Sequence, residues 1–304
     1  MPSLLGIDLG GTKIAIARYD AETFERQDFV REDTRAHERG DAVFARMLEL
    51  AVNMRAADTT AVGIGVPGFV QRPEGIIRTL PNIPGAEGKP LKEIAGKALS
   101  LPVTVDNDAS CFTLAEALCG TGKGHAIVVG ITMGTGVGGG IVMDGRLFHG
   151  AHGFAAEIGH MLLQPGHPPY PTEDQRGDVE QFISGTAMGR RCSAAKRPED
   201  YLVGDVCAFL QPEVVREVAE LCASITHLLD PSVIVFGGSA GRALKPHLKE
   251  IEQELSQWVY KGTPLPALAI GSVSDAGTVG AALLTQESEQ RSAMSDQPSH
   301  CRGL

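Results

Sequence analysis

Short apolar runs alternate with turn residues and helical patterns along the first 120 residues. Residues 4–9 and 14–17 are rich in β-forming side chains and flank Gly10-Gly11-Thr12, which predicts two strands joined by a turn. In residues 38–57 the apolar positions recur at three- and four-residue spacing, which predicts an amphipathic helix. The same signals predict the remaining elements of this stretch: strands at 62–66 and 103–105, helices at 91–99 and 109–118, and a long ordered loop rich in Pro and Gly at 72–90.

The second half of the chain opens by repeating the first pattern. An apolar strand at 125–133, a glycine-rich turn at 134–140 and a returning strand at 141–143 reproduce the strand–turn–strand unit about 120 residues further on. Two copies of one unit suggest a duplicated architecture, although glycine turns alone could also produce the likeness. The elements predicted beyond them are helices from 179 to 229, a strand at 233–236 entering Gly237-Gly238, a helix at 243–258, a strand at 267–271, a last helix near 278–284, and a polar tail from Gln286.

Composition and charge narrow the class of protein. The chain has 304 residues, enough for two domains, and 37 acidic against 27 basic side chains give a net charge of −10. That acidity argues against nucleic acid or an anionic membrane as a partner, since both require a basic surface. No apolar run reaches the roughly 18 residues of a membrane span, and residues 1–5 lack the basic start of a signal peptide. The six cysteines are scattered without a CxxC pair, as in a reducing cytosol. We therefore expect a cytoplasmic enzyme or binding protein.

The glycine-rich turns are the first candidate chemistry. Gly134, Gly136 and Gly139 satisfy the spacing of a dinucleotide-binding loop, but that fingerprint needs a helix directly after the loop, and here a strand is predicted. A P-loop is excluded because no G-x-x-x-x-G-K-[ST] run occurs. Glycine hairpins can still bind phosphate through backbone N–H groups, and Asp8 inside the first hairpin suits a Mg²⁺ partner. The alternative is that these are ordinary tight turns, which fits either loop alone better than the pair together with Asp8.

Further motifs follow these loops in a fixed order. The complete set is Gly6-Ile7-Asp8-Leu9-Gly10-Gly11-Thr12-Lys13, Asp106-Asn107-Asp108, Gly134 to Gly140, Glu157-Ile158-Gly159-His160, Glu180-Gln181-Phe182-Ile183-Ser184-Gly185, Gly237-Gly238 and Gly277-Thr278-Val279-Gly280-Ala281-Ala282. This ordered set resembles the ROK family of sugar kinases and repressors. The resemblance implies an actin-like (ribonuclease H-like) α/β ATPase fold of two domains, with ATP along the cleft between them and the sugar at its base. We expect an N-terminal α/β domain at 1–120, a C-terminal α/β domain at 121–285 and a polar tail at 286–304.

The resemblance assigns roles in the N-terminal domain. Asp108 would be the catalytic general base that deprotonates the attacking hydroxyl. Its alternative role is that of a helix N-cap, because a helical pattern follows it. Asn107 would exchange hydrogen bonds with sugar hydroxyls. Gly68 and Asn82 would lie near the sugar, although packing of their loops explains them nearly as well.

Three further sugar-binding residues are expected in the C-terminal domain. Glu157 and His160 would contact sugar hydroxyls, and they share one face if their segment forms a helical turn. Glu180 would add a third acceptor, and an acceptor-rich pocket suits a neutral polyol.

ATP and Mg²⁺ are the cofactors that the resemblance implies. The residues expected to bind the nucleotide or its metal are Asp8, Gly10, Gly11, Thr12, Lys13, Gly134, Thr135, Gly136, Gly138, Gly237 and Gly238.

The chain departs from the family at a metal site. Most ROK kinases carry zinc, held by the histidine equivalent to His160 and by a C-x-C-G-x-x-G-C-x-E segment. Aligned from Glu180, the three cysteine positions hold Pro171, Glu173 and Asp178, so no thiolate remains. His160 and the two carboxylates could form an oxygen-rich site, but a solvated acidic loop is the preferred interpretation, and we predict that structural zinc is absent. Packing or oligomer contacts must then order this loop, whose prolines restrict its backbone.

These expectations lead to an ATP-dependent hexose kinase. The loop at 80–90 and residues 106–116 most resemble bacterial N-acetylglucosamine kinases, so the best candidate reaction phosphorylates the 6-hydroxyl of N-acetyl-D-glucosamine. A fructokinase or glucokinase of the same family is the alternative. A non-catalytic sugar sensor or repressor is more remote, because the first strand starts by Leu4 and leaves no room for an N-terminal helix-turn-helix. We expect a homodimer or homotetramer whose small-molecule partners are a sugar and ATP.

Overall fold

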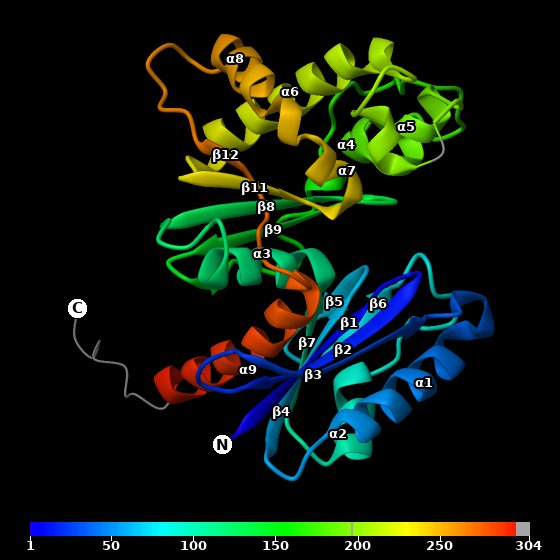
Figure 1. Cartoon of the computed structure of the whole chain (residues 1–304), viewed down its shortest axis with the longest axis vertical. Helices are drawn as coiled ribbons and strands as arrows, with labels where there is room; N and C mark the ends of the chain where they lie inside the picture. The colour runs from blue at the N-terminus through cyan, green and yellow to red at the C-terminus, as the bar shows by residue number, and fades with distance from the viewer. Residues whose placement is uncertain (196, 296–304) are drawn as a thin grey trace. The chain divides into compact units, whose positions relative to one another are not determined.

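The computed structural model describes residues 1–195 and 197–295, which form two compact units. The first unit comprises Met1–Cys111 and the C-terminal segment from Asp275, and the second comprises Phe112–Ser274. Each unit is a sheet with helices packed against it (Figure 1). This division differs from the expected boundaries at residues 120 and 285, because the last helix packs on the sheet of the first unit and the unit boundary falls inside the helix that follows residue 107.

The sheet of the first unit has five strands in the order β3-β2-β1-β4-β7. Strand β2 runs antiparallel to both β1 and β3, whereas β1, β4 and β7 run parallel to one another. The strands are β1 (Ser3–Leu9), β2 (Lys13–Asp20), β3 (Arg26–Asp33), β4 (Thr59–Val66) and β7 (Val103–Asn107), with a separate hairpin of β5 (Phe69–Gln71) and β6 (Ile76–Thr79). The helices of this unit are η1 (Ala36–Glu38), α1 (Arg39–Met54), α2 (Leu91–Leu99) and α9 (Ala276–Ser295).

Side-chain alternation gives this sheet two unlike faces. The buried Leu and Ile side chains of β1 pack in one core with those of α1 and α2, whereas α9 lies against the opposite face (Figure 1). A Cβ atom at Gly6 would overlap the backbone oxygen of Thr278, and one at Gly63 would overlap that of Ala281. Glycine at these two positions therefore lets the backbone of α9 lie directly on the sheet.

The sheet of the second unit repeats this arrangement, with strand order β10-β9-β8-β11-β12. Strand β9 is antiparallel to β8 and β10, and β8, β11 and β12 are parallel. The same order and directions in both units confirm the duplicated architecture. The strands are β8 (Ile127–Met133), β9 (Val137–Met143), β10 (Arg146–Leu147), β11 (Val233–Gly237) and β12 (Ala267–Ile270).

The second core forms where the sheet meets its helices. Buried side chains of β8 and β11 pack with those of α4 to α8, and α6 lies alongside α8 (Figure 1). The opposite face receives α3, since Phe112 packs on Gly237 and Thr113 on Gly130. The helices are α3 (Asp108–Cys119), η2 (Ile158–His160), α4 (Val179–Ile183), α5 (Gly185–Arg191), η3 (Pro198–Tyr201), η4 (Ala208–Leu210), α6 (Gln211–Leu229), α7 (Gly238–Ala243), η5 (Lys245–His247) and α8 (Leu248–Trp258).

Several elements differ from the sequence-based predictions. The expected loop at 72–90 contains strand β6, and β9 starts at Val137, so most of the expected glycine turn is strand. The helix expected at 243–258 is broken at Pro246, whose ring fixes φ and removes a backbone donor. Helix α9 continues to Ser295, through the start of the expected polar tail, and residues 296–304 lie outside the described part of the chain.

One disulfide joins Cys192 and Cys207, whose Cα atoms are 6.1 Å apart. The scattered cysteine spacing gave no indication of this pair, because the two cysteines are 15 positions apart and form no motif. The 3₁₀ helix η3 (Pro198–Tyr201) lies between them. No helix within residues 1–195 and 197–295 combines the length and apolar character needed to cross a membrane.

Candidate active site

In the first unit, the predicted site residues gather at the carboxyl ends of the parallel strands. Asp8 near the end of β1 pairs with Gly65 on β4, and Gly65 pairs with Asp106 on β7. Asp108 follows at the start of α3. Ligands of open α/β sheets bind at this edge, because the strands end there and the connecting loops diverge.

Thr34 stabilises the glycine hairpin between β1 and β2 through two hydrogen bonds. Gly10 N–H donates to the Lys13 carbonyl at 2.9 Å, which closes the turn. The Thr34 hydroxyl donates to the Gly10 carbonyl at 2.6 Å, and Thr34 N–H donates to the Thr12 carbonyl at 2.9 Å. Asn82 lies against Gly11, so the predicted sugar loop and phosphate loop meet. Lys13, in contrast, forms an exposed ion pair with Asp33.

Asp8 is a partly buried carboxylate beside α9. A side chain at Gly277 would overlap its carboxyl group, so glycine there makes room for it. Burial raises the pKa of Asp8 to about 6, with Arg31 lowering and Asp275 raising it by smaller amounts. Arg26 and Arg31 hold Asp275 at 2.7 and 2.5 Å. At neutral pH, above this raised pKa, the Asp8 carboxyl group is therefore charged although burial disfavours its charged form.

Asn107, rather than Asp108, caps helix α3. Its Oδ1 accepts the N–H groups of Ala109 at 2.8 Å and Ser110 at 3.1 Å, and its Nδ2 donates to the Gly68 carbonyl at 3.1 Å. Asp108 accepts the N–H of Ala109 at 2.8 Å. The structure thus gives the capping role considered for Asp108 to its neighbour, and it engages the Asn107 amide with protein groups, including the predicted sugar-site residue Gly68.

Two residues of this half were missed by the sequence analysis. Arg72 forms an ion pair with the buried Asp106, whose Oδ1 also accepts Asn107 N–H at 2.8 Å. Burial, reinforced by the nearby carboxylates of Asp106, Asp8 and Asp108, raises the pKa of the Cys111 thiol well above its usual value. No local motif marks Arg72, because it lies 34 residues from its partner.

In the second unit, the glycine turn between β8 and β9 is tied to the start of α5. Gly134 N–H donates to the Gly136 carbonyl at 2.9 Å, and Gly185 N–H donates to the Gly134 carbonyl at 2.8 Å. The Thr186 hydroxyl donates to the Thr135 carbonyl at 2.8 Å. This turn follows the carboxyl end of β8, beside Gly237-Gly238 at the end of β11. The predicted phosphate-binding glycines of this unit therefore share one edge of its sheet, as those of the first unit do.

Glu180 supports that same turn. Its Oε2 accepts Val137 N–H at 2.8 Å, and a side chain at Gly136 would overlap the carboxylate. Gly138 lies one residue further along β9. A residue expected at the sugar therefore also contacts the second phosphate loop.

Glu157 and His160 lie on the expected helical turn. Glu157 precedes η2 and His160 ends it, and His160 N–H donates to the Glu157 carbonyl at 3.1 Å. The turn packs on β9, since a Cβ at Gly159 would overlap the Val137 carbonyl. Burial raises the pKa of Glu157, an effect that His160 opposes and Glu180 reinforces. The three predicted sugar acceptors therefore lie close together.

The residues at the family's zinc position do not fit zinc. Asp178 is buried, and its Oδ2 lies 3.3 Å from His160 Nδ1 and 3.4 Å from the guanidinium of Arg176. This carboxylate therefore already has a cationic side chain beside it. Glu173 is exposed. Across the described part of the chain, no group of three or more His, Cys, Asp or Glu side chains is arranged to hold a metal ion. The expectation of a solvated acidic loop holds for Glu173 but is wrong for Asp178, which is 1% exposed.

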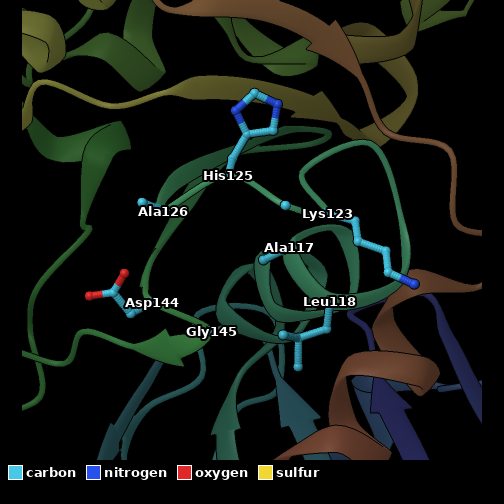
Figure 2. Close-up of a pocket in the computed structure, with 8 residues that line it drawn as sticks. Ala117, Leu118, Lys123, His125, Ala126, Asp144 and Gly145 are labelled. Atoms are coloured by element: carbon cyan, nitrogen blue, oxygen red, sulfur yellow. The ribbon is translucent and has the colours of Figure 1, made fainter.

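A cavity of about 520 Å³ lies elsewhere in the second unit, between the end of α3 and the β9–β10 turn. Figure 2 shows Lys123, His125 and Asp144 at its rim with their charged or polar ends pointing apart. None of the predicted site residues lines it, and its polar groups do not converge on a common point.

Comparison with known proteins identifies the family to which the chain belongs. The ROK family model matches residues 4–288. The chain is 30% identical to the glucokinase of Thermotoga maritima, over 93% of this chain and 97% of that protein. It is 32% identical to the N-acetyl-D-glucosamine kinase of Mannheimia succiniciproducens, over 92% and 98%. A ROK family glucokinase from Streptomyces griseus, solved with glucose and AMPPNP, superposes with a TM-score of 0.76 at 29% identity, over 94% and 99%. The expected actin-like (ribonuclease H-like) α/β fold is confirmed.

Proposed function

Because the chain belongs to the ROK family, we propose that this sugar kinase transfers the γ-phosphate of ATP to the 6-hydroxyl of a hexose, with N-acetyl-D-glucosamine as the preferred acceptor. The observation that carries the proposal is the gathering of the motif residues at the carboxyl edge of the parallel strands in each unit. Asp8, the hairpin from Gly10 and Asp108 occupy this edge in the first unit.

Asp108 is the proposed general base. Its carboxylate accepts the proton of the 6-hydroxyl as that oxygen forms its bond to the γ-phosphorus and the bond to the β-phosphate oxygen breaks, which releases ADP. Asn107 makes this assignment stronger, because it supplies the cap of α3 that Asp108 would otherwise provide. The backbone amides of the two glycine loops bind phosphate oxygens.

Mg²⁺ supplies charge neutralisation on the phosphates when bound. Asp8 is the residue that would hold it, directly or through water, because a carboxylate with a raised pKa at a phosphate site gains most from a nearby cation. The ATP analogue bound by the Streptomyces griseus glucokinase supports ATP as the donor.

The acceptor is proposed from the second unit and from the sugar loop. Glu157, His160 and Glu180 offer acceptor atoms for sugar hydroxyls, and the segments at 80–90 and 106–116 favour N-acetyl-D-glucosamine. Glucose is the second candidate, because relatives of similar identity include a glucokinase. Fructose and a purely sensory role are the remaining alternatives. We place the enzyme in the cytoplasm as a homodimer or homotetramer.

The test is ADP release with Mg·ATP across N-acetylglucosamine, glucose, N-acetylmannosamine, glucosamine, fructose and mannose. The expected result is one fast sugar, with kcat lowered about 10²- to 10⁴-fold in Asp108→Asn. The matched control is Asp144→Asn, which changes an exposed aspartate at a turn position with φ of 48° that asparagine adopts readily. Inactivity of the correctly folded protein on every sugar would contradict the proposal, as would equal activity of the Asp108 variant.

A further inference from the structure

His160 is oriented by a buried carboxylate that belongs to another element. Its side chain is 43% exposed, whereas the Asp178 side chain behind it is 1% exposed, and Asp178 Oδ2 lies 3.3 Å from His160 Nδ1. A carboxylate can only accept in this contact, so Nδ1 carries the proton. The outward nitrogen, Nε2, is then the acceptor.

Asp178 is itself fixed from several directions. Its Oδ1 accepts Gln181 N–H at 3.2 Å, and Gln181 Oε1 accepts Asp178 N–H at 3.3 Å, which together form a capping box at the start of α4. Gln181 Oε1 also accepts Gly177 N–H at 2.7 Å. Arg176 faces Asp178 Oδ2 at 3.4 Å and is bound by both oxygens of Asp174. The carboxylate therefore has neutral donors and a cation around it, as a buried charge requires.

The loop that carries Asp178 is closed by its own backbone. Leu163 and Gln164 N–H groups both donate to the Gly177 carbonyl at 2.9 Å, and Val179 N–H donates to the Met161 carbonyl at 2.8 Å. Further along the loop, the guanidinium of Arg190 lies 4.9 Å from the ring centroid of Tyr170, which ties the loop to α5. These contacts order a loop that has no thiolate ligands.

We propose that Asp178 is a metal-independent positioning residue, which sets the tautomer and direction of His160 and, through the cap of α4, the position of Glu180. This inference rests on the proposed sugar-kinase function. Glu180 lies two residues after Asp178 in the first turn of α4, and its carboxylate accepts Val137 N–H at the glycine turn. One buried side chain thus aligns a sugar-facing nitrogen and the support of the phosphate loop.

The tautomer of His160 determines whether this side chain accepts or donates a hydrogen bond at the sugar. With the proton on Nδ1, Nε2 of His160 accepts the hydrogen of a sugar hydroxyl, and that hydroxyl remains available to accept a bond from elsewhere. If the proton moved to Nε2, the histidine would become a donor, and an acceptor-rich pocket would lose one of its acceptors.

Asp178→Asn is the discriminating variant because it is nearly isosteric. The amide oxygen can still accept Gln181 N–H and preserve the cap, while the amide NH₂ faces His160 Nδ1 and donates to it. The proton of His160 then moves to Nε2. The matched control is Glu173→Gln, which neutralises an exposed carboxylate of the same loop.

The first readout does not depend on activity. In ¹⁵N spectra of the full-length protein at pH 8, the His160 signal, assigned by its loss in His160→Gln, is expected in the Nδ1–H form for the wild type and for Glu173→Gln. Asp178→Asn is expected in the Nε2–H form. The second readout is kinetic: the KM for the sugar rises about tenfold in Asp178→Asn, while the KM for ATP stays within about twofold.

The third readout concerns metal. Protein dialysed against EDTA and returned to Mg²⁺ is expected to keep its melting temperature and its sugar KM, and protein incubated with zinc alone and then desalted is expected to retain less than one equivalent.

An Nε2–H tautomer in the wild type, an unchanged tautomer in Asp178→Asn, or one tightly held equivalent of zinc would each overturn the inference. A kinase that proves inactive on every sugar but shows the expected tautomers would contradict the proposed function and leave the positioning role of Asp178 supported.

Discussion

Replacing Asp8 with asparagine is expected to stabilise the protein while abolishing its activity. Asp8 is partly buried, and burial raises its pKa from 3.8 to about 6. In a folded protein a carboxyl group with a raised pKa binds protons more tightly than in the unfolded chain, so the free energy of unfolding falls as the pH rises between these two values. An amide of the same size removes that cost.

The magnitude follows from the shift. A difference of about 2 pKa units corresponds to about 3 kcal/mol at pH 8, and solvent screening of the partly exposed group reduces the expected gain to about 1–2 kcal/mol. Above pH 6 the gain is complete. It shrinks as the pH falls and disappears below pH 4, where Asp8 is protonated in both folded and unfolded wild-type chains.

Urea unfolding of the wild type and of Asp8→Asn, at pH 4 and pH 8 in EDTA, measures this difference. EDTA removes Mg²⁺, whose binding would stabilise the charged form of the wild type. Asp28→Asn is the matched control, because Asp28 is exposed on β3 and its replacement leaves stability within about 0.5 kcal/mol at both pH values. An Asp8 variant no more stable than wild type at pH 8, or a gain that persists at pH 4, would refute the reasoning.

Three further destabilising substitutions and one control substitution, all followed by urea unfolding, test the packing within each unit. Gly63→Ala places a Cβ against the backbone of α9 and is expected to cost about 1–3 kcal/mol, whereas Gly96→Ala in α2 meets only ordinary contacts and is expected to be neutral or stabilising; equal effects would contradict this. Arg191→Met leaves the buried Glu217 without its 2.7 Å partner, at a cost of about 3–5 kcal/mol. Burial already raises the pKa of Glu217. The loss of stability is therefore expected to shrink from pH 8 to pH 5, as the Glu217 carboxyl group is protonated. A loss of stability that does not change with pH would contradict this explanation. Cys192→Ser opens the disulfide and is expected to cost about 3 kcal/mol, with the variant, unlike the wild type, insensitive to reductant.

Local patterns predicted most of the elements because helix and strand periodicity are properties of neighbouring residues. The helix at 91–99 was predicted with the observed bounds, and the repeated strand–turn–strand unit indicated the duplicated sheet. Where a prediction was wrong, strand pairing or a proline had a stronger effect than the local pattern. The glycines after residue 136 continue into β9 because they pair with β8, and a helix expected to run through Pro246 is interrupted there.

Some features of the candidate site could likewise be predicted from the sequence, and others could not. Asp8, the glycine hairpins, Asp108 and the Glu157–His160 turn are contiguous motifs, so the order of residues along the chain was enough to select them. The roles of Asn107 as a cap and of Lys13 as an ion-pair partner of Asp33 depend on how each side chain turns, and the motif carries no information about that.

By itself, the sequence determined the class of fold, the family motifs and the loss of the zinc-binding cysteines. Only the tertiary structure showed which groups contact the two sugar-site candidates of the second unit: Asp178 contacts His160, 18 residues away in the sequence, and Glu180 contacts Val137, 43 residues away. The physical reason is that a buried charge needs partners in three dimensions, and those partners are supplied by segments that periodicity and spacing treat as independent. The same holds for α9, which returns to the first sheet because Gly6 and Gly63 leave its surface open for a helix backbone.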